Sequence, residues 1–175
     1  GIEDGGPGVG RLMVPSSIVI DSTGTNLYVS ASDQPGTIVK IDIATQYITH
    51  IAGNKTQHGH TDSSSPLQAT FTHIMGISIS PDDSYLAIIG WANYKIRKLD
   101  LTGQTGVTTV FGNGSSGSVN LNSNGLSMTP RGLVINSEGD RLYITESGSA
   151  NAIRIFETAQ LVITTYNPGY YIEQY

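Results

Sequence analysis

The chain has 175 residues, of which 38% are hydrophobic and 13% are charged, and its formal net charge is −5. This composition belongs to a folded domain with a core rather than to a disordered polyelectrolyte, and the net negative charge argues against binding to nucleic acid. Cysteine is absent, which excludes disulfides, thiolate zinc sites and cysteine nucleophiles.

The first group of predicted strands lies near residues 17–21, 27–31, 37–42 and 46–51. Ile18 and Ile20 alternate with polar or smaller residues, which is typical of a strand with one buried face. The stretch Ser-Thr-Gly-Thr at 22–25 has the residue types of a hairpin turn. The pattern therefore predicts a four-stranded antiparallel unit.

Two further groups of strands follow. The second is predicted near residues 76–80, 85–89, 95–100 and 107–111, and the third near 131–136, 141–145, 152–156 and 161–166. Residues 85–89, Tyr-Leu-Ala-Ile-Ile, are apolar at every position, which indicates a strand packed on both faces. The turns Pro-Asp-Asp-Ser at 81–84 and Ser-Glu-Gly-Asp at 137–140 match the first hairpin in chemistry.

The three groups are internal repeats. Segments 15–42, 74–100 and 130–157 align, with equivalent anchors at Ile18, Ile77 and Leu133 and again nine residues later at Leu27, Leu86 and Leu142. Four-stranded units repeated at this period predict an all-β fold, a β-propeller with three four-stranded antiparallel blades. A β-sandwich is the alternative, but it does not explain the period. The chain is then a single propeller segment over 1–175, with blades at about 15–54, 74–113 and 130–168.

Three blades leave two edges and two apolar sheet faces uncovered. We therefore expect the segment to be part of a six-bladed or larger propeller, completed by the rest of a longer chain or by a second copy. The sequence shows no charged region followed by an apolar leader, and it starts at Gly1 without an initiator Met; a processed product or a part of a longer chain is expected.

Three stretches carry a family resemblance. Residues 91–100, Trp-Ala-Asn-Tyr-Lys-Ile-Arg-Lys-Leu-Asp, are similar to an N-x-x-I-R-K-I-D third strand, and residues 107–112, Val-Thr-Thr-Val-Phe-Gly, to a V-x-T-x-A-G fourth strand. Residues 129–133, Thr-Pro-Arg-Gly-Leu, are similar to a P-x-G-[IV] start of an inner strand. Over nearly its whole length the chain thus resembles NHL-repeat β-propellers. It departs from them where the family often ends the second strand in Asp, because Ala31, Gly90 and Glu146 stand there.

Candidate chemistry is sparse, and no catalytic or cofactor-binding residue is predicted. His58 and His60 have the spacing of metal ligands, but a metal site needs three or four convergent ligands, so a solvated loop is the simpler interpretation. The resemblance implies that enzymes of this kind hold metals at the central channel. There, Arg131 and Glu146 are the candidate ligand contacts: Arg131 suits an anion, or it forms an ion pair with Glu146 or a neighbour.

Two sequons, Asn54-Lys55-Thr56 and Asn113-Gly114-Ser115, are candidate N-glycosylation sites. Asn54 and Asn113 are equivalent, since each follows the glycine that ends a fourth strand. They are expected on exposed loops of one rim, where an ordinary Gly-Asn turn is the alternative interpretation.

These observations favour a non-catalytic structural or protein-interaction propeller module, with a subunit of an extracellular glycoprotein assembly or filament as a special case. The alternative is a fragment of an NHL-like or lactonase-like metal-dependent propeller enzyme, whose remaining blades would bring further His, Glu and Asp residues to the inner loops. The expected partner is protein, by self-association or through remaining blades, with attached glycans. No cofactor and no nucleic acid are expected, and no run reaches the roughly 18 apolar residues of a membrane span. The expected location is extracellular or at the cell surface.

Overall fold

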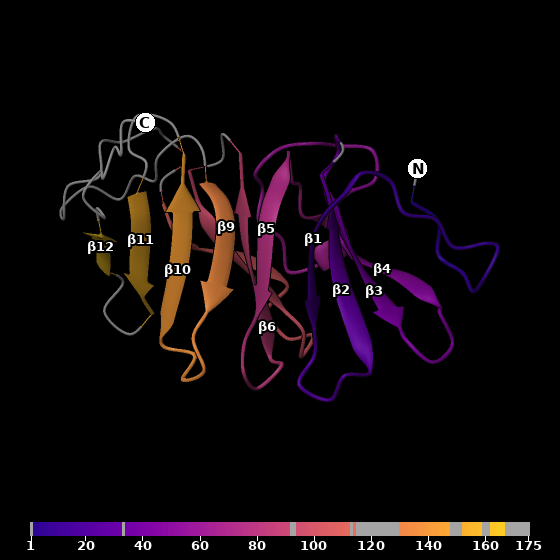
Figure 1. Ribbon diagram of the computed structural model, residues 1–175. Coiled ribbons are helices and arrows are strands. Elements are labelled where there is room, and N and C mark those ends of the chain that lie inside the picture. Colours follow the sequence, from indigo (N-terminus) through magenta and orange to yellow (C-terminus); the bar gives the residue numbers. More distant parts are fainter. Residues whose placement is uncertain are drawn as a thin grey trace, which may run out of the picture.

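The computed structural model describes residues 2–32, 34–91, 94–112, 114, 130–147, 152–158 and, for the backbone alone, 162–166. These residues form three four-stranded antiparallel sheets with the strand orders β1-β2-β3-β4, β5-β6-β7-β8 and β9-β10-β11-β12 (Figure 1). The bounds are β1 Pro15–Ile20, β2 Asn26–Ala31, β3 Thr37–Asp42, β4 Ile48–Ala52, β5 Ile74–Ile79, β6 Tyr85–Gly90, β7 Ile96–Asp100, β8 Val107–Phe111, β9 Pro130–Ile135, β10 Arg141–Glu146, β11 Ala152–Glu157 and β12 Val162–Tyr166. The predicted all-β architecture of three blades is confirmed, and every predicted strand is present. Within the described residues no helix has the length and hydropathy needed to cross a membrane.

The first hairpin of each sheet turns in the same way. The third residue of each predicted turn stretch has a positive φ, at Gly24 (71°), Asp83 (57°) and Gly139 (76°). Glycine adopts this conformation without a steric penalty, and Asp tolerates it better than most residues. The turn residues named from the sequence therefore set the strand register, because a one-residue shift would exchange the two faces of the sheet.

The sheets stack side by side in chain order, and their first strands, β1, β5 and β9, contact one another in turn (Figure 1). We call the face of a sheet that points toward the next sheet in the chain its forward face, and the opposite face its backward face. The middle sheet is covered on both faces, so that Leu86, Ala87, Ile88 and Ile89 of β6 are each at most 2% exposed. This is the radial stacking that defines propeller blades.

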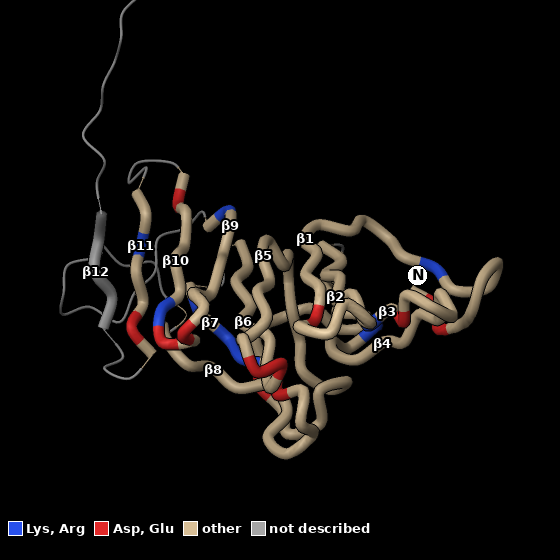
Figure 2. Tube along the Cα trace, turned by 60° about the horizontal axis from the view of Figure 1, so that its bottom comes forward, with Lys and Arg blue, Asp and Glu red and all other residues tan. Residues whose placement is uncertain are grey.

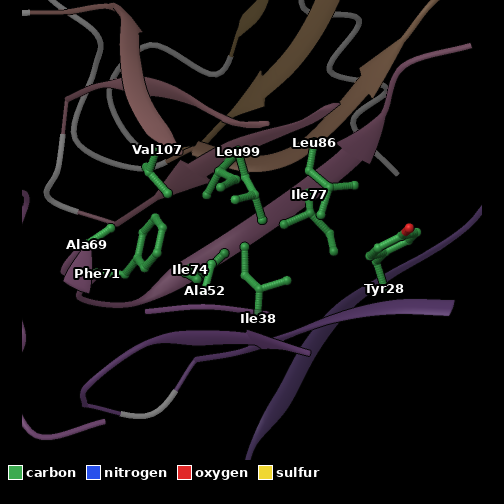
Figure 3. Close-up of a cluster of buried hydrophobic side chains, with 11 residues drawn as sticks. Tyr28, Ile38, Ala52, Ala69, Phe71, Ile74, Ile77, Leu86, Leu99 and Val107 are labelled. Carbon is green, nitrogen blue, oxygen red and sulfur yellow. The ribbon is translucent and has the colours of Figure 1, made fainter. Parts of the chain in front are cut away.

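The first joint lies between the first and second sheets. Tyr28 and Ile38 on the forward face of the first sheet pack with Ile77 and Leu86 on the backward face of the second (Figure 3). Phe71, from the loop that precedes β5, closes the same cluster. The backbone N–H of Ile77 also donates to the Ser17 hydroxyl at 3.2 Å, which links β1 to β5.

The second joint repeats this design between the second and third sheets. Ile89 and Ile96 on the forward face of the second sheet pack with Leu142 and Phe156 of the third. A serine again links the first strands, since the N–H of Ile135 donates to the Ser78 hydroxyl at 3.0 Å. The two joints therefore combine apolar packing with one hydroxyl bond to the neighbouring first strand.

The segments that precede the first and second sheets bind the fourth strand of those sheets, β4 and β8, in equivalent ways. Gly5 pairs with Ile48 at the start of β4, and Ser63 pairs with Val107 at the start of β8. Beside these bridges, Asp4 accepts the N–H of His50 at 3.1 Å and Asp62 accepts the N–H of Thr109 at 2.6 Å. Residues 2–14 are thus the structural counterpart of the loop between the first two blades.

Replacing Ile77 by Ala tests the first joint. Ile77 is 2% exposed within the shared cluster, so we expect the free energy of unfolding to fall by about 2–5 kcal/mol. Leu67 is 44% exposed, and Leu67→Ala is expected to change stability by at most about 0.5 kcal/mol. Urea unfolding followed by circular dichroism measures both, and equal losses would contradict close packing at the joint.

Candidate functional site

A buried arginine stands at the same position of the third strand in the second and third sheets. Arg97 of β7 is 2% exposed and Arg154 of β11 is 5% exposed, and the strand pairing aligns both with Val39 of β3. A charged side chain at such a depth needs charge-assisted hydrogen bonds to remain stable.

Arg97 fastens the loop between the first two blades to the sheet. Its Nε donates to Asp62 Oδ1 at 2.9 Å, and its two terminal nitrogens donate to the carbonyls of Thr61 and Thr70 at 2.7 Å each. The guanidinium lies 4.3 Å from the centroid of the Phe71 ring. Burial lowers the pKa of Arg97 and the neighbouring Asp62 opposes that change; the guanidinium stays charged.

Glu146, a predicted channel residue, is bound by Arg154 instead. The Arg154 Nε donates to Glu146 Oε2 at 2.7 Å, and both side chains are almost fully buried. Arg131, the other predicted channel residue, is exposed on β9 and donates from Nε to the Ser147 hydroxyl at 3.0 Å. The two candidates therefore have different partners, and the expectation of an ion pair between them is replaced by the Glu146–Arg154 pair. Whether Arg131 contacts a ligand stays a prediction.

His58 and His60 lie in the loop that ends at β5. The pKa of His60 is lowered, first by partial burial and then by the charges of Arg97 and Lys95. Within the described ranges, no group of three or more His, Asp and Glu side chains is placed to hold a metal ion. Asp62, the nearest acidic residue in the sequence, is engaged by Arg97.

Asn54 follows β4 in a tight turn. Its Oδ1 accepts the N–H of Thr56 at 2.9 Å, the hydroxyl of Thr56 at 2.8 Å and the N–H of Gln57 at 3.1 Å. A turn is therefore present at Asn54, as in the alternative interpretation of the sequon. In this turn the hydroxyl of Thr56 is bonded to the side chain of Asn54. Asn113 lies outside the described residues.

The residue that follows each first strand forms part of the hairpin turn. Asp21, Ser80 and Asn136 each accept, through a side-chain oxygen, the backbone N–H five residues later, at 3.2, 3.0 and 2.9 Å. These bonds lower the pKa of Asp21, chiefly through Asn26. Hydrogen bonds from the serines that flank it lower the pKa of the neighbouring Asp82 to about 2. The carboxylates of Asp21 and Asp82 are thus bound within their own hairpins.

The sequence comparison missed a cluster at the rim where β2 and β6 end. The His73 Nδ1 donates to the carbonyl of Ser32, with 2.8 Å between the two atoms, so its Nε2 can accept from Gln34 Nε2, which lies 2.9 Å away. The ring centroids of His73 and Trp91 are 5.7 Å apart, and Trp91 is 46% exposed. The three side chains come from different loops, so only the fold could bring them together.

Comparison with known proteins supports the fold. No family model matches the chain, and no curated protein sequence matches it. Among solved structures, it is similar to hydrazine synthase of Kuenenia stuttgartiensis, with a TM-score of 0.63, 17% identity and coverage of 91% of this chain and 38% of that one. A chain of a nidogen/laminin complex gives a TM-score of 0.62, 18% identity and coverage of 90% and 48%. The WD40 repeats of RRP9 give a TM-score of 0.57 and 16% identity, with coverage of 94% of this chain and 43% of that one.

These similarities define the class: the chain is a three-bladed part of a β-propeller. It spans less than half the length of each of these structures.

Replacing Arg97 by Met tests the fastening of the loop. The change leaves Asp62 and the carbonyls of Thr61 and Thr70 without their donors, so we expect a loss of about 2–4 kcal/mol in the free energy of unfolding. Arg11→Met is the control, because Arg11 and Glu3 are exposed and 3.9 Å apart, a pair worth at most about 1 kcal/mol. Thermal and urea unfolding measure both variants, and similar losses for the two would refute the role of Arg97.

Proposed function

We propose that the chain is a non-catalytic structural or protein-interaction module of the NHL-repeat type that acts through contacts with other protein surfaces. The observation that carries this proposal is the uncovered apolar surface at the two ends of the stack. Ile18 and Ile20 of β1 are 59% and 50% exposed, and Val134 of β9 is 55% exposed. In the joints inside the molecule, residues at the equivalent positions are packed against a neighbouring sheet.

Charge distribution supports the same proposal. Acidic residues lie mainly near turns and strand ends, while basic residues also lie within strands, as on β7 and β11 (Figure 2). The buried charged groups are engaged by the fold, as in the Arg97–Asp62 and Arg154–Glu146 pairs. The surface left over for function is therefore apolar at the sheet faces and polar and aromatic at the rim around Trp91.

The NHL resemblance gains support from the roles of its motif residues. Arg97, in the stretch similar to N-x-x-I-R-K-I-D, fastens the preceding loop. Asp100, which ends that stretch, accepts the backbone N–H groups of Thr102, Gln104 and Thr105. Both residues stabilise a repeating unit made of a loop and four strands, which is what a repeat motif is expected to do.

Sedimentation velocity tests the contact function. If the end surfaces bind protein, the 175-residue chain should associate at micromolar concentrations, and Ile18→Asp should weaken association at least about tenfold, because an unpaired charge would be buried. Leu67→Asp, at an exposed position in the loop between the first two blades, should leave it unchanged. A chain that stays monomeric at tens of micromolar would overturn the proposal.

We also propose that the module belongs to an extracellular glycoprotein. The support is the exposed loop that carries Asn54 and its bonded Thr56, together with the equivalent sequon at Asn113. On expression through a eukaryotic secretory pathway, Asn54→Gln should remove one glycan mass, and Asn113→Gln is the matched comparison. Intact mass before and after enzymatic deglycosylation is the measurement; an unmodified wild-type chain would refute this part.

A further inference from the structure

The two end surfaces of the stack match the two sides of a joint that already exists in the molecule. The first joint brings the forward face of the first sheet against the backward face of the second. The free surfaces are the forward face of the third sheet and the backward face of the first. Strand pairing makes it possible to compare these four faces position by position.

The forward face of the third sheet resembles that of the first. In the first sheet, Val19 pairs with Tyr28 across β1 and β2; in the third, Val134 pairs with Tyr143 across β9 and β10. The third strands continue the match, with Ile38 beside Ser30 and Ile153 beside Thr145. The pattern of Val, Tyr, hydroxyl residue and Ile that packs on the second sheet is thus repeated on a face where Val134 is 55% exposed.

The backward face of the first sheet resembles that of the second. In the second sheet, Ile77 pairs with Ile88 and Ile79 with Leu86, and this set forms the receiving side of the first joint. The corresponding pairs of the first sheet are Ile18 with Val29 and Ile20 with Leu27. The side chains differ by no more than a methyl group at these four positions. Ile18 and Ile20 are nevertheless 59% and 50% exposed.

We infer that a second copy of this chain closes the ring, with the forward face of the third sheet of each copy packed on the backward face of the first sheet of the other. This inference rests on the proposed contact function and specifies its partner. Twice the three blades of one chain make six, which lies within the range of blades found in closed propellers. The contact is head-to-tail, and such contacts form closed rings when the rotation between copies allows it.

The existing joints also predict which residues meet. Ser78 lies against Ile135 in the second joint, and the equivalent positions across the new joint are Val134 and Ile20. Gly76 faces the next first strand, and a Cβ added to it would lie 3.4 Å from the N of Leu133, an ordinary van der Waals distance. Gly132, which occupies the same position as Gly76 in the third sheet, leaves room for the backbone at Ile18.

The link between hairpin turns is not required for a joint. In the first joint, Asp83 accepts the N–H of Ser22 at 3.0 Å. The second joint has Gly139 at the position of Asp83 and Pro81 at the position of Ser22, and a Cβ added to Gly139 would lie 3.3 Å from Cδ of Pro81. The new joint would place Gly24 against Ser137, so it resembles the second joint in using no carboxylate there.

Single introduced cysteines test the inference, because the chain has none of its own. Ile20→Cys and Val134→Cys are placed to meet across the joint, and a disulfide needs Cα atoms within about 7 Å. After mild oxidation, an equimolar mixture of the two single variants should form covalent dimers containing one of each. The double variant should give a covalent dimer at twice the 18.6 kDa of the chain, and pairing Leu67→Cys with Val134→Cys should give none.

The outcomes separate this inference from the contact function on which it rests. Covalent dimers of mixed composition, together with a sedimenting mass of two chains that Ile20→Asp or Val134→Asp reduces to one, would support the closed ring. Dimers formed by Ile20→Cys alone would mean that first sheets pack face to face, which overturns the ring but keeps the contact function. Masses above two chains would also overturn it, in favour of an open filament. A wild-type monomer at tens of micromolar would overturn both proposals, and circular dichroism checks that each variant is folded.

Discussion

Each sheet of this protein is apolar on both faces, and burying both faces is the constraint on which the rest of the structure depends. The middle sheet meets it, with four consecutive residues of β6 at most 2% exposed. The outer sheets meet it fully on one face, while on the other face Ile18, Ile20 and Val134 stay exposed. Exposing apolar surface to water costs about 25 cal/mol per Å², so burying the free faces against protein would be favourable. These faces have the same side-chain pattern as the faces already joined.

The buried charged side chains hold loops and strands of the stacked sheets together. Arg97 draws the loop between the first two blades against β7, and Asp62 from that loop also holds the outer strand β8 through Thr109. The first blade has Val39 where the others have arginine. Its preceding segment is held by Asp4 on His50 instead. The preceding segment is therefore attached to the sheet in both blades, with the buried guanidinium in the second blade and without it in the first. The part that both attachments share is the acidic residue, Asp4 or Asp62.

Much of the fold could be predicted because propeller repeats are local. Strand alternation, hairpin residues such as Gly24 and Asp83, and the repeated isoleucines are all read within one repeat, and the twelve strands followed from them. The candidate site was harder. Arg131 and Glu146 were predicted as channel contacts, with an ion pair of Arg131 to Glu146 or to a neighbour as the alternative; in the fold the neighbouring strand supplies Arg154 to Glu146. Sequence spacing alone does not show which arginine shares a sheet face with Glu146, because that depends on the strand register.

The sequence by itself determined the class of fold, the strand order and the residue types at each turn, since these depend on local propensity and on period. Only the tertiary structure decided which polar groups are bound within the fold, how residues 2–14 attach to β4, and that Gln34, His73 and Trp91 meet at one rim. It also decided which apolar faces remain uncovered. These features depend on how sheets stack, and stacking brings together residues far apart in the chain.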